Sequence, residues 1–412
     1  MKVLLINNFH YRRGGSEAVY FNTGELLKAA GHKVVYFSQK CNSNADDENA
    51  SFFVDAERPG IRGKLVRILH YFNNREAAGN IKALIAKEHP DIAHVHLFWG
   101  GISASVIAVL HKHGIPIVHT AHDFRMVCPA YTFRDSEGKV CEKCKGGHFM
   151  ECFKNRCSKG RMVDSLLMSL EMFYRNNKWH PAKELDGIIY VSNFSKRKHE
   201  LMDPMFKEVT STVLYNFSNM PEHQGKSGEE PDYYLYYGRL SQEKGLHTLV
   251  EAFCRHPELH LKIVGTGPLE KELRANRHDN IEMLGYLSGE PLFEVVRNAR
   301  FVCVPSECYE NNPMTIVEAY SVGVPVIGAD LGGITEVVQN DVTGFLFESG
   351  SIDGLSDKLE LSKTLTADKY EGMRKSAKDF ADRHFNSSVY LKNLMDFYNV
   401  ILNKSKERWT DQ

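Results

Sequence analysis

Short apolar segments alternate with longer amphipathic ones from the first residues of the chain. The first half predicts strands at 2–7, 33–38, 91–96, 115–119 and 187–191, and it predicts a helix at 17–30 that Gly31 closes. Strands that are apolar on both faces belong in parallel sheets, which crossover helices cover on each side. The first half is therefore predicted to form a Rossmann-like α/β layer structure.

A polar stretch at 219–232 interrupts this rhythm and has the composition of a linker. The alternation then resumes, with strands predicted at 233–237, 260–264, 281–284, 301–304 and 324–327. We expect two doubly wound domains, 1–220 and 221–385, that face each other across a ligand cleft. The segment 386–412 has helical apolar spacing and is expected to return to the first domain.

Composition and charge narrow the class of protein. The chain has 412 residues, of which 42% are hydrophobic and 25% charged, and this excludes collagen-like, disordered and small disulfide-stapled proteins. Residues 1–200 carry 29 Lys and Arg against 20 Asp and Glu, whereas the remainder carries 22 against 32. A basic first half suits an anionic partner, such as a pyrophosphate or a phospholipid surface, although solvated surface charge would give the same count.

The second half places polar residues directly after predicted strands. Arg239 and Lys244 lie five residues apart in a loop that can grip a diphosphate, and Glu310 and Glu318 bracket the start of the next helix. In that segment Asn312 is expected to cap the helix and Pro313 to open it, which would turn free amides toward an anion. Taken alone, these residues also fit solvated surface charges and a buried cap partner.

Four motifs together resemble the family 4 retaining glycosyltransferases of the GT-B fold. They are Gly-Arg-Leu-Ser-x-Glu-Lys-Gly at 238–245, Gly-Thr-Gly-Pro at 265–268, the spaced pair Glu310 and Glu318, and the glycine-rich run at 323–333. The resemblance covers nearly the whole chain, is of the polysaccharide-biosynthesis type, and implies a nucleotide-diphosphate sugar as donor. It also implies a glycan acceptor, which we expect to be lipid-linked.

The same resemblance implies a role for each matching residue. Arg239 and Lys244 would bind the donor diphosphate, Glu318 the ribose hydroxyls, and Glu310 the hydroxyls of the transferred sugar. Amides of Asn312, Met314 and Thr315 would cradle the sugar and the distal phosphate, with no metal needed for catalysis. For retention without a covalent nucleophile, the departing phosphate would take the acceptor proton.

Two segments of the first half match the family as well. A glycine pair opens a helix after the first strand. The resemblance implies that Gly15 contacts the nucleotide-sugar donor. A plain turn is the alternative interpretation of the pair. His122 follows the strand predicted at 115–119. A lone histidine at a strand end is commonly a satisfied structural group, but His122 resembles the family histidine near the anomeric carbon, so we expect it to be catalytic. The neighbouring Asp123 is expected to orient a side chain or to assist the acceptor.

Five of the nine cysteines fall in the insertion 125–160. A Cys-x-x-Cys pair with further thiols nearby can build a tetrahedral zinc site. A subset of the resembling transferases shares this pattern, which implies a structural zinc on Cys128, Cys141, Cys144 and Cys157 and leaves Cys152 spare. Plain reduced thiols are the alternative.

Basic amphipathic patterns occur at 58–75 and 154–174, and both would suit an anionic membrane. Ordinary helices packed on the sheet explain them equally well. No signal peptide or spanning segment is evident, so we expect a cytoplasmic protein that is peripheral on the cytoplasmic face of the membrane. A nucleotide-sugar epimerase or hydrolase of the same fold remains an alternative, as does a nucleic-acid-binding protein. We expect no nucleic acid partner, because the cations are not interleaved with aromatics.

Overall fold

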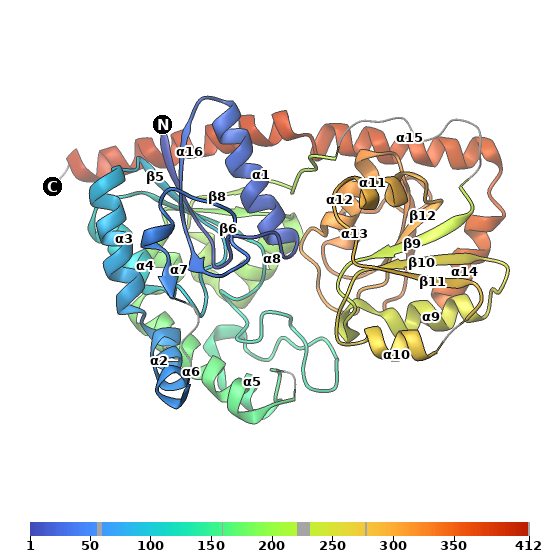
Figure 1. Ribbon diagram of the computed structural model, residues 1–412, viewed down its shortest axis with the longest axis horizontal. Helices are drawn as coiled ribbons and strands as arrows, with labels where there is room; N and C mark the ends of the chain where they lie inside the picture. The colour runs from blue at the N-terminus through green and yellow to red at the C-terminus, as the bar shows by residue number, and fades with distance from the viewer. Residues whose placement is uncertain (56–59, 159, 221–230, 277, 411–412) are drawn as a thin grey trace. The chain divides into compact units, whose positions relative to one another are not determined.

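The computed structural model describes residues 1–410 except 56–59, 159, 221–230 and 277. The chain forms two compact units, Met1–Leu214 together with Leu391–Gln412, and Tyr215–Tyr390 (Figure 1). The division falls six residues before the predicted boundary, and most of the predicted linker at 219–232 lies outside the described residues. The segment 386–412, predicted to return to the first domain, contains the whole of α16 (Ser387–Thr410), and the first unit includes this helix from Leu391 onward.

The first unit is a parallel six-stranded sheet covered by helices. Its strands run in the order β2-β1-β5-β6-β7-β8. They are β1 (Lys2–Ile6), β2 (Lys33–Phe37), β5 (Ile92–Val95), β6 (Ile117–Ala121), β7 (Gly187–Tyr190) and β8 (Ser211–Val213). The helices are α1 (Gly15–Ala29), α2 (Gly60–Phe72), α3 (Arg75–Glu88), α4 (Ser105–Lys112), α5 (Met150–Lys154), α6 (Met162–Lys178), α7 (Pro181–Glu184) and α8 (Asn193–Met202), together with α16.

Short elements fill the connections of the first unit. They are the two-residue strands β3 (Gln39–Lys40) and β4 (Val54–Asp55), which pair with each other, and the 3-10 turns η1 (Ala50–Phe52), η2 (Lys145–Gly147) and η3 (Pro204–Lys207). The helix α16 is tied to the sheet, because the Tyr398 hydroxyl lies 2.6 Å from Nδ1 of His94 on β5. This contact joins residues that are 304 positions apart in the sequence.

The second unit is a second parallel sheet with the order β11-β10-β9-β12-β13-β14. Its strands are β9 (Tyr233–Tyr237), β10 (His260–Val264), β11 (Ile281–Gly285), β12 (Phe301–Val304), β13 (Val326–Ala329) and β14 (Gly344–Phe347). Its helices are α9 (Leu246–Cys254), α10 (Glu270–Ala275), α11 (Glu290–Arg297), α12 (Met314–Ser321), α13 (Ile334–Val337), α14 (Ile352–Lys363) and α15 (Ala367–His384), with the turn η4 (Gln242–Lys244).

The strand β9 shows why this sheet has two covered faces. Leu235 and Tyr237 pack in one core cluster with residues of α12 and α15, whereas Tyr234 and Tyr236 pack in another with residues of α9 and α14. Successive side chains of a strand point to opposite faces, so a strand of five buried residues needs helices on both. The run of tyrosines therefore encodes a central strand.

Each sheet has a point where the strand order reverses. In the first unit it lies between β1 and β5, and in the second between β9 and β12. Ligands of open parallel sheets bind beyond the carboxyl ends of the strands at such points. No helix in the described part of the chain combines the length and the apolar character needed to cross a membrane.

Candidate active site

The loop after β9 carries Arg239 and Lys244, and main-chain contacts fix its path. The Tyr236 hydroxyl donates to the Arg239 carbonyl at 2.8 Å, and the Leu240 amide donates to the Thr266 carbonyl at 2.9 Å. Gly245 ends the loop at φ +71°, where a Cβ would lie 1.8 Å from the Pro305 carbonyl oxygen. Only glycine allows this approach, so the loop after β9 is pressed against the segment that follows β12.

Lys244 and Glu310 meet at this point. The Lys244 Nζ lies 2.5 Å from the Glu310 Oε1, and the Ser306 hydroxyl donates to the same oxygen at 2.8 Å. Their side chains are 31% and 15% exposed. Burial lowers the pKa of Lys244, but the Glu310 carboxylate more than offsets this and the pKa stays above its usual value. The structure thus brings two of the predicted site residues into direct contact from loops on adjacent strands.

A glycine turn holds the Glu310 loop from the other side. The Gly333 amide donates to the Glu310 carbonyl at 2.7 Å, and a Cβ on Gly333 would lie 1.8 Å from the Asn311 carbonyl oxygen. Gly333, at the end of the glycine-rich run at 323–333, is therefore required by its close approach to the backbone that carries Glu310.

The start of α12 differs from the prediction. Pro313 is itself the N-cap residue, and Asn312 does not cap the helix. The Asn312 Oδ1 instead accepts from the Asn216 amide at 2.8 Å, and its carbonyl accepts from the Asn216 Nδ2 at 2.8 Å. The first intrahelical hydrogen bond of α12 runs from the Ile316 amide to the Pro313 carbonyl. The Met314 and Thr315 amides, which come before it, therefore have no acceptor within the helix. These two amides form the positive end of α12.

Glu318 lies one turn further along α12, beside the Tyr237 side chain. The Tyr237 hydroxyl donates to the Thr315 carbonyl at 2.8 Å and also contacts the Glu318 carboxyl. Burial raises the pKa of Glu318 to about 7, and the hydrogen bond from Tyr237 only partly counters this. Glu318 therefore changes charge near neutral pH. The Arg239 side chain is exposed on the same loop as Lys244. Within the described residues, its guanidinium makes no hydrogen bond or ion pair with the other candidate site residues.

In the first unit, Gly15 begins α1 just after β1, and the preceding Gly14 is extended. Glu17 in the first turn is buried at 3% exposure, and burial raises its pKa, while hydrogen bonds with Ser16 and Asn7 act to lower it. Asn7 also accepts from the Leu97 amide at 3.0 Å. The loops after β1 and β5 are thereby joined at the reversal point of this sheet.

His122 belongs to a stack of histidines that the sequence analysis missed. Its Nε2 lies 2.8 Å from the Nδ1 of His96, and the two rings are stacked with centroids 5.1 Å apart. The His96 ring stacks in turn on His94 at 4.4 Å. Burial lowers the pKa of His94 and His122 to about 3, and that of His96 well below its usual value. His122 is therefore a neutral imidazole whose ring plane is fixed by its neighbours.

A signal for this stack exists in the sequence. His94 and His96 alternate along a strand, so their side chains point to the same face of the sheet. His96 and His122 then follow adjacent parallel strands, β5 and β6, at the same edge.

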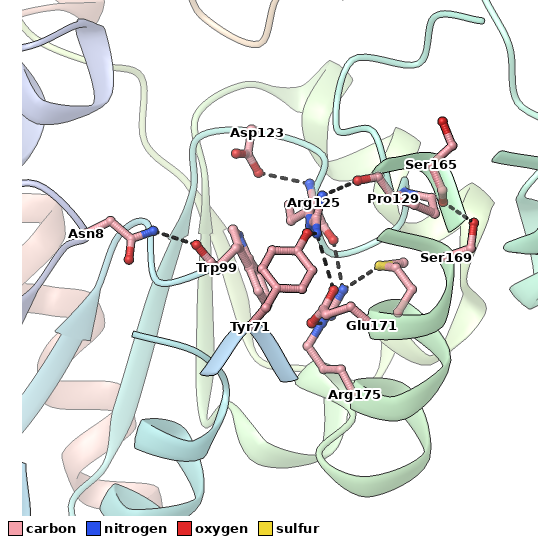
Figure 2. A network of polar contacts seen from close by, with 11 residues as sticks. Asn8, Tyr71, Trp99, Asp123, Arg125, Pro129, Ser165, Ser169, Glu171 and Arg175 are labelled. Carbon is pink, nitrogen blue, oxygen red and sulfur yellow. Dashed lines mark hydrogen bonds and ion pairs between the residues drawn. The ribbon is translucent and has the colours of Figure 1, made fainter. Parts of the chain in front are cut away.

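The loop after His122 is anchored by a buried ionic network (Figure 2). Arg125 donates to the Tyr71 hydroxyl and lies 3.4 Å from the Glu171 Oε2, while the Arg175 Nε lies 2.9 Å from the Glu171 Oε1. Asp123 has a local structural contact, because its Oδ1 accepts from the Arg125 amide at 2.9 Å. Burial raises the pKa of Asp123. This network joins the His122 loop to α2 and α6.

All five cysteines of the insertion are free thiols. Cys152, which the sequence analysis left spare, is hydrogen-bonded to Cys157, and this bond lowers the pKa of Cys152. Within the described residues, the group whose ligand atoms all lie within 4.8 Å of one another is His256, Glu258 and Glu360, at the surface, rather than any set of cysteines. Zinc on Cys128, Cys141, Cys144 and Cys157 stays a prediction.

Comparison with known proteins identifies the family. The model described as "Glycosyltransferase Family 4" matches residues 13–217, and the one described as "Glycosyl transferases group 1" matches residues 220–380. The chain belongs to the family 4 glycosyltransferases. An uncharacterised 42.6 kDa protein in the cps region of Klebsiella pneumoniae is 24% identical to this glycosyltransferase over 358 residues, which are 82% of this chain and 87% of the relative. An Escherichia coli protein that carries the name of a colanic acid biosynthesis glycosyltransferase, WcaL, is 25% identical over 239 residues, 54% of this chain and 57% of WcaL.

Solved structures show the same GT-B fold. Sucrose-phosphate synthase from Thermosynechococcus elongatus superposes with a TM-score of 0.71 at 18% identity, covering 98% of this glycosyltransferase and 99% of that chain. Anabaena HepE in complex with UDP gives a TM-score of 0.64 at 16% identity, covering 97% and 100%. The prediction of two α/β domains with parallel sheets, and of the family, is confirmed.

Proposed function

We propose that this glycosyltransferase moves a sugar, with retention of configuration, from a nucleotide-diphosphate donor to a glycan acceptor in cell-surface polysaccharide synthesis. The observation that carries the proposal is the contact between Lys244 and Glu310 beside the start of α12. HepE was solved with UDP and with UDP-glucose, which supports a nucleotide sugar as donor. The name of WcaL supports a polysaccharide product, and an acceptor of that class is expected to be lipid-linked.

The charges at the reversal point of the second sheet suit a diphosphate. Lys244 offers an ammonium, the exposed Arg239 a guanidinium, and the Met314 and Thr315 amides the positive end of a helix. These groups neutralise the charge that develops on the departing diphosphate, so the proposed reaction needs no metal ion for that purpose. Glu318 would accept from the ribose hydroxyls, most strongly when it is ionised.

Glu310 would bind hydroxyls of the transferred sugar while staying paired with Lys244. This pairing links the two halves of the donor, since the ammonium contacts the diphosphate and the carboxylate contacts the sugar. His122, neutral and held by His96, would donate or accept a hydrogen bond without carrying charge.

The proposed step keeps the anomeric configuration without a covalent enzyme intermediate. The bond from C1 to the diphosphate oxygen breaks, and the acceptor oxygen forms a bond to C1 on the same face through an oxocarbenium-like state. The acceptor proton passes to an oxygen of the departing diphosphate. The products are the glycosylated acceptor and a nucleoside diphosphate.

We also propose that the insertion binds one structural zinc through its cysteine thiols. Five thiols lie within the insertion 125–160, and four thiolates are a common ligand set of structural zinc. Such an ion would order the loop and take no part in the transfer.

The test is a transfer assay with UDP-, GDP- and ADP-sugars and lipid-linked glycan extracts. We expect one donor to give a glycosylated lipid, and proton NMR of the product to show the anomeric configuration of the donor. Lys244→Met should abolish transfer, and Lys369→Met, an exposed lysine of the same unit, should not. Free sugar released at the same rate without acceptor would instead indicate a hydrolase, and an inverted product would refute retention.

A further inference from the structure

The helix α2 presents an unusual apolar face to solvent. Seven of the sixteen large apolar side chains that are exposed in the described residues lie on α2 and α6. On α2 the exposed fractions are 79%, 58%, 45% and 67% for Ile61, Leu65, Ile68 and Leu69. An α-helix turns by about 100° per residue, so these four side chains share one face. Exposed apolar patches of this kind mark interaction sites.

Cations border that face. Arg62 and Lys64 are exposed and fall on either side of the apolar stripe, and Arg67 is exposed beyond Lys64. The sequence of α2 holds no acidic residue. A second copy of this chain would have to bring matching acids to the rim, whereas an anionic lipid surface supplies both an apolar interior and negative head groups. Charge and apolarity together favour the lipid surface.

The C-terminal end of α2 is fixed to the body of the first unit. The Tyr71 hydroxyl accepts a hydrogen bond from Arg125. The centroid of the Phe72 ring lies 5.7 Å from that of Tyr174 on α6. Figure 1 shows α2 and α6 together at one end of this unit. On α6, Met162, Val163 and Leu170 are also exposed. The stripe is therefore presented by an anchored helix.

We propose that α2, assisted by α6, docks this glycosyltransferase on a membrane rich in anionic lipid. The apolar stripe inserts at the level of the head groups while Arg62, Lys64 and Arg67 contact their phosphates. Arg125 couples the docking helix to the loop that carries His122, three residues away in sequence. The inference goes beyond the proposed function and is independent of it, because membrane binding requires no donor and no turnover.

The experiment is co-sedimentation of the full chain with vesicles of phosphatidylglycerol and phosphatidylcholine in equal parts, and with vesicles of phosphatidylcholine alone. We expect binding to the mixed vesicles only. Leu65→Ser with Leu69→Ser should weaken it by roughly 10-fold or more. Replacing Arg62, Lys64 and Arg67 by Gln should weaken it by roughly 100-fold at low salt.

The matched control replaces two leucines that are exposed elsewhere, Leu201→Ser with Leu361→Ser, and should bind like the wild type. Equal binding to both vesicle types, or equal loss in the control, would overturn the proposal. So would a wild-type dimer in size-exclusion chromatography that Leu65→Ser with Leu69→Ser dissociates, because the stripe would then be a contact between copies. Transfer to a short water-soluble acceptor, measured on the same variants, shows separately whether the enzyme is active.

Discussion

Replacing Lys244 and Glu310 by neutral isosteres should change nucleotide binding in opposite directions. Lys244→Met removes the ammonium that we expect to contact the diphosphate. Among the described residues, the Ser306 hydroxyl still donates to the half-buried Glu310 carboxylate. A hydrogen bond to a charged group contributes about 1.5 to 3 kcal/mol, so affinity for a nucleoside diphosphate should fall roughly 10- to 150-fold. The carboxylate left behind repels the ligand and pushes the loss toward the upper value.

Glu310→Gln keeps the size of the side chain and an acceptor for Ser306 but removes the negative charge beside Lys244. Nucleoside diphosphate affinity should stay the same or increase. Transfer should nevertheless fall about 100-fold or more, because hydrogen bonds to sugar hydroxyls strengthen in the transition state. The split between binding and turnover is the signature of a residue that contacts the sugar and not the diphosphate.

The assay is isothermal titration with UDP, GDP and ADP, followed by steady-state transfer, with thermal unfolding as a check on the fold. Lys369→Met serves as the control for a lost surface charge. Two results would refute the reasoning: unchanged nucleotide affinity in Lys244→Met, or a loss of affinity in Glu310→Gln as large as that in Lys244→Met. The second would mean that Glu310 merely holds the loop in place.

Four further predictions concern other groups. We expect Glu318, whose pKa burial raises to about 7, to accept from the ribose hydroxyls more strongly when it is ionised, so nucleotide-sugar affinity measured by titration should rise with pH through neutrality, and Glu318→Gln should bind more weakly and without this pH dependence. His122→Ala should lower kcat and leave nucleotide affinity unchanged; because its pKa is about 3, His122 should contribute no ionisation to a pH profile between about pH 5 and 8. Glu171→Gln leaves Arg125 and Arg175 buried without their shared anion and should cost about 3 to 5 kcal/mol in urea unfolding, and an unchanged midpoint would contradict this. Elemental analysis of protein purified without added metal should give close to one zinc per chain, and zinc-free folded protein would reduce the insertion to plain thiols.

The second sheet shows what the sequence could predict. The runs at 233–237, 260–264 and 301–304 are strands with the predicted bounds, because each is a short apolar run between turn residues. Residues that follow such strands lie at one edge of a parallel sheet, which is why the sequence could assign Lys244 and Glu310 to one site. The ion pair between the two was not predicted. Two edge strands, β8 and β14, were missed. The three residues of β8 are only partly buried and carry too little periodicity to stand out.

The missed contacts depend on partners far away in the chain. Asn312 has the right type and place for a helix cap, but the Asn216 backbone, 96 residues earlier, takes its side chain instead. A local rule cannot foresee such a competitor. Likewise, the fixed orientation of His122 depends on His96 from a neighbouring strand, and that of His94 on Tyr398 near the other end of the chain.

The central claim is that the loops after β9 and β12 bind the donor diphosphate. Hydrogen–deuterium exchange of the full chain with UDP, GDP or ADP tests it directly. We predict that a nucleotide that binds will slow exchange in peptides covering 238–245 and 306–318 and will leave the outer helix α14 unchanged. Binding that protects other peptides and leaves both of these segments unaltered would contradict the account.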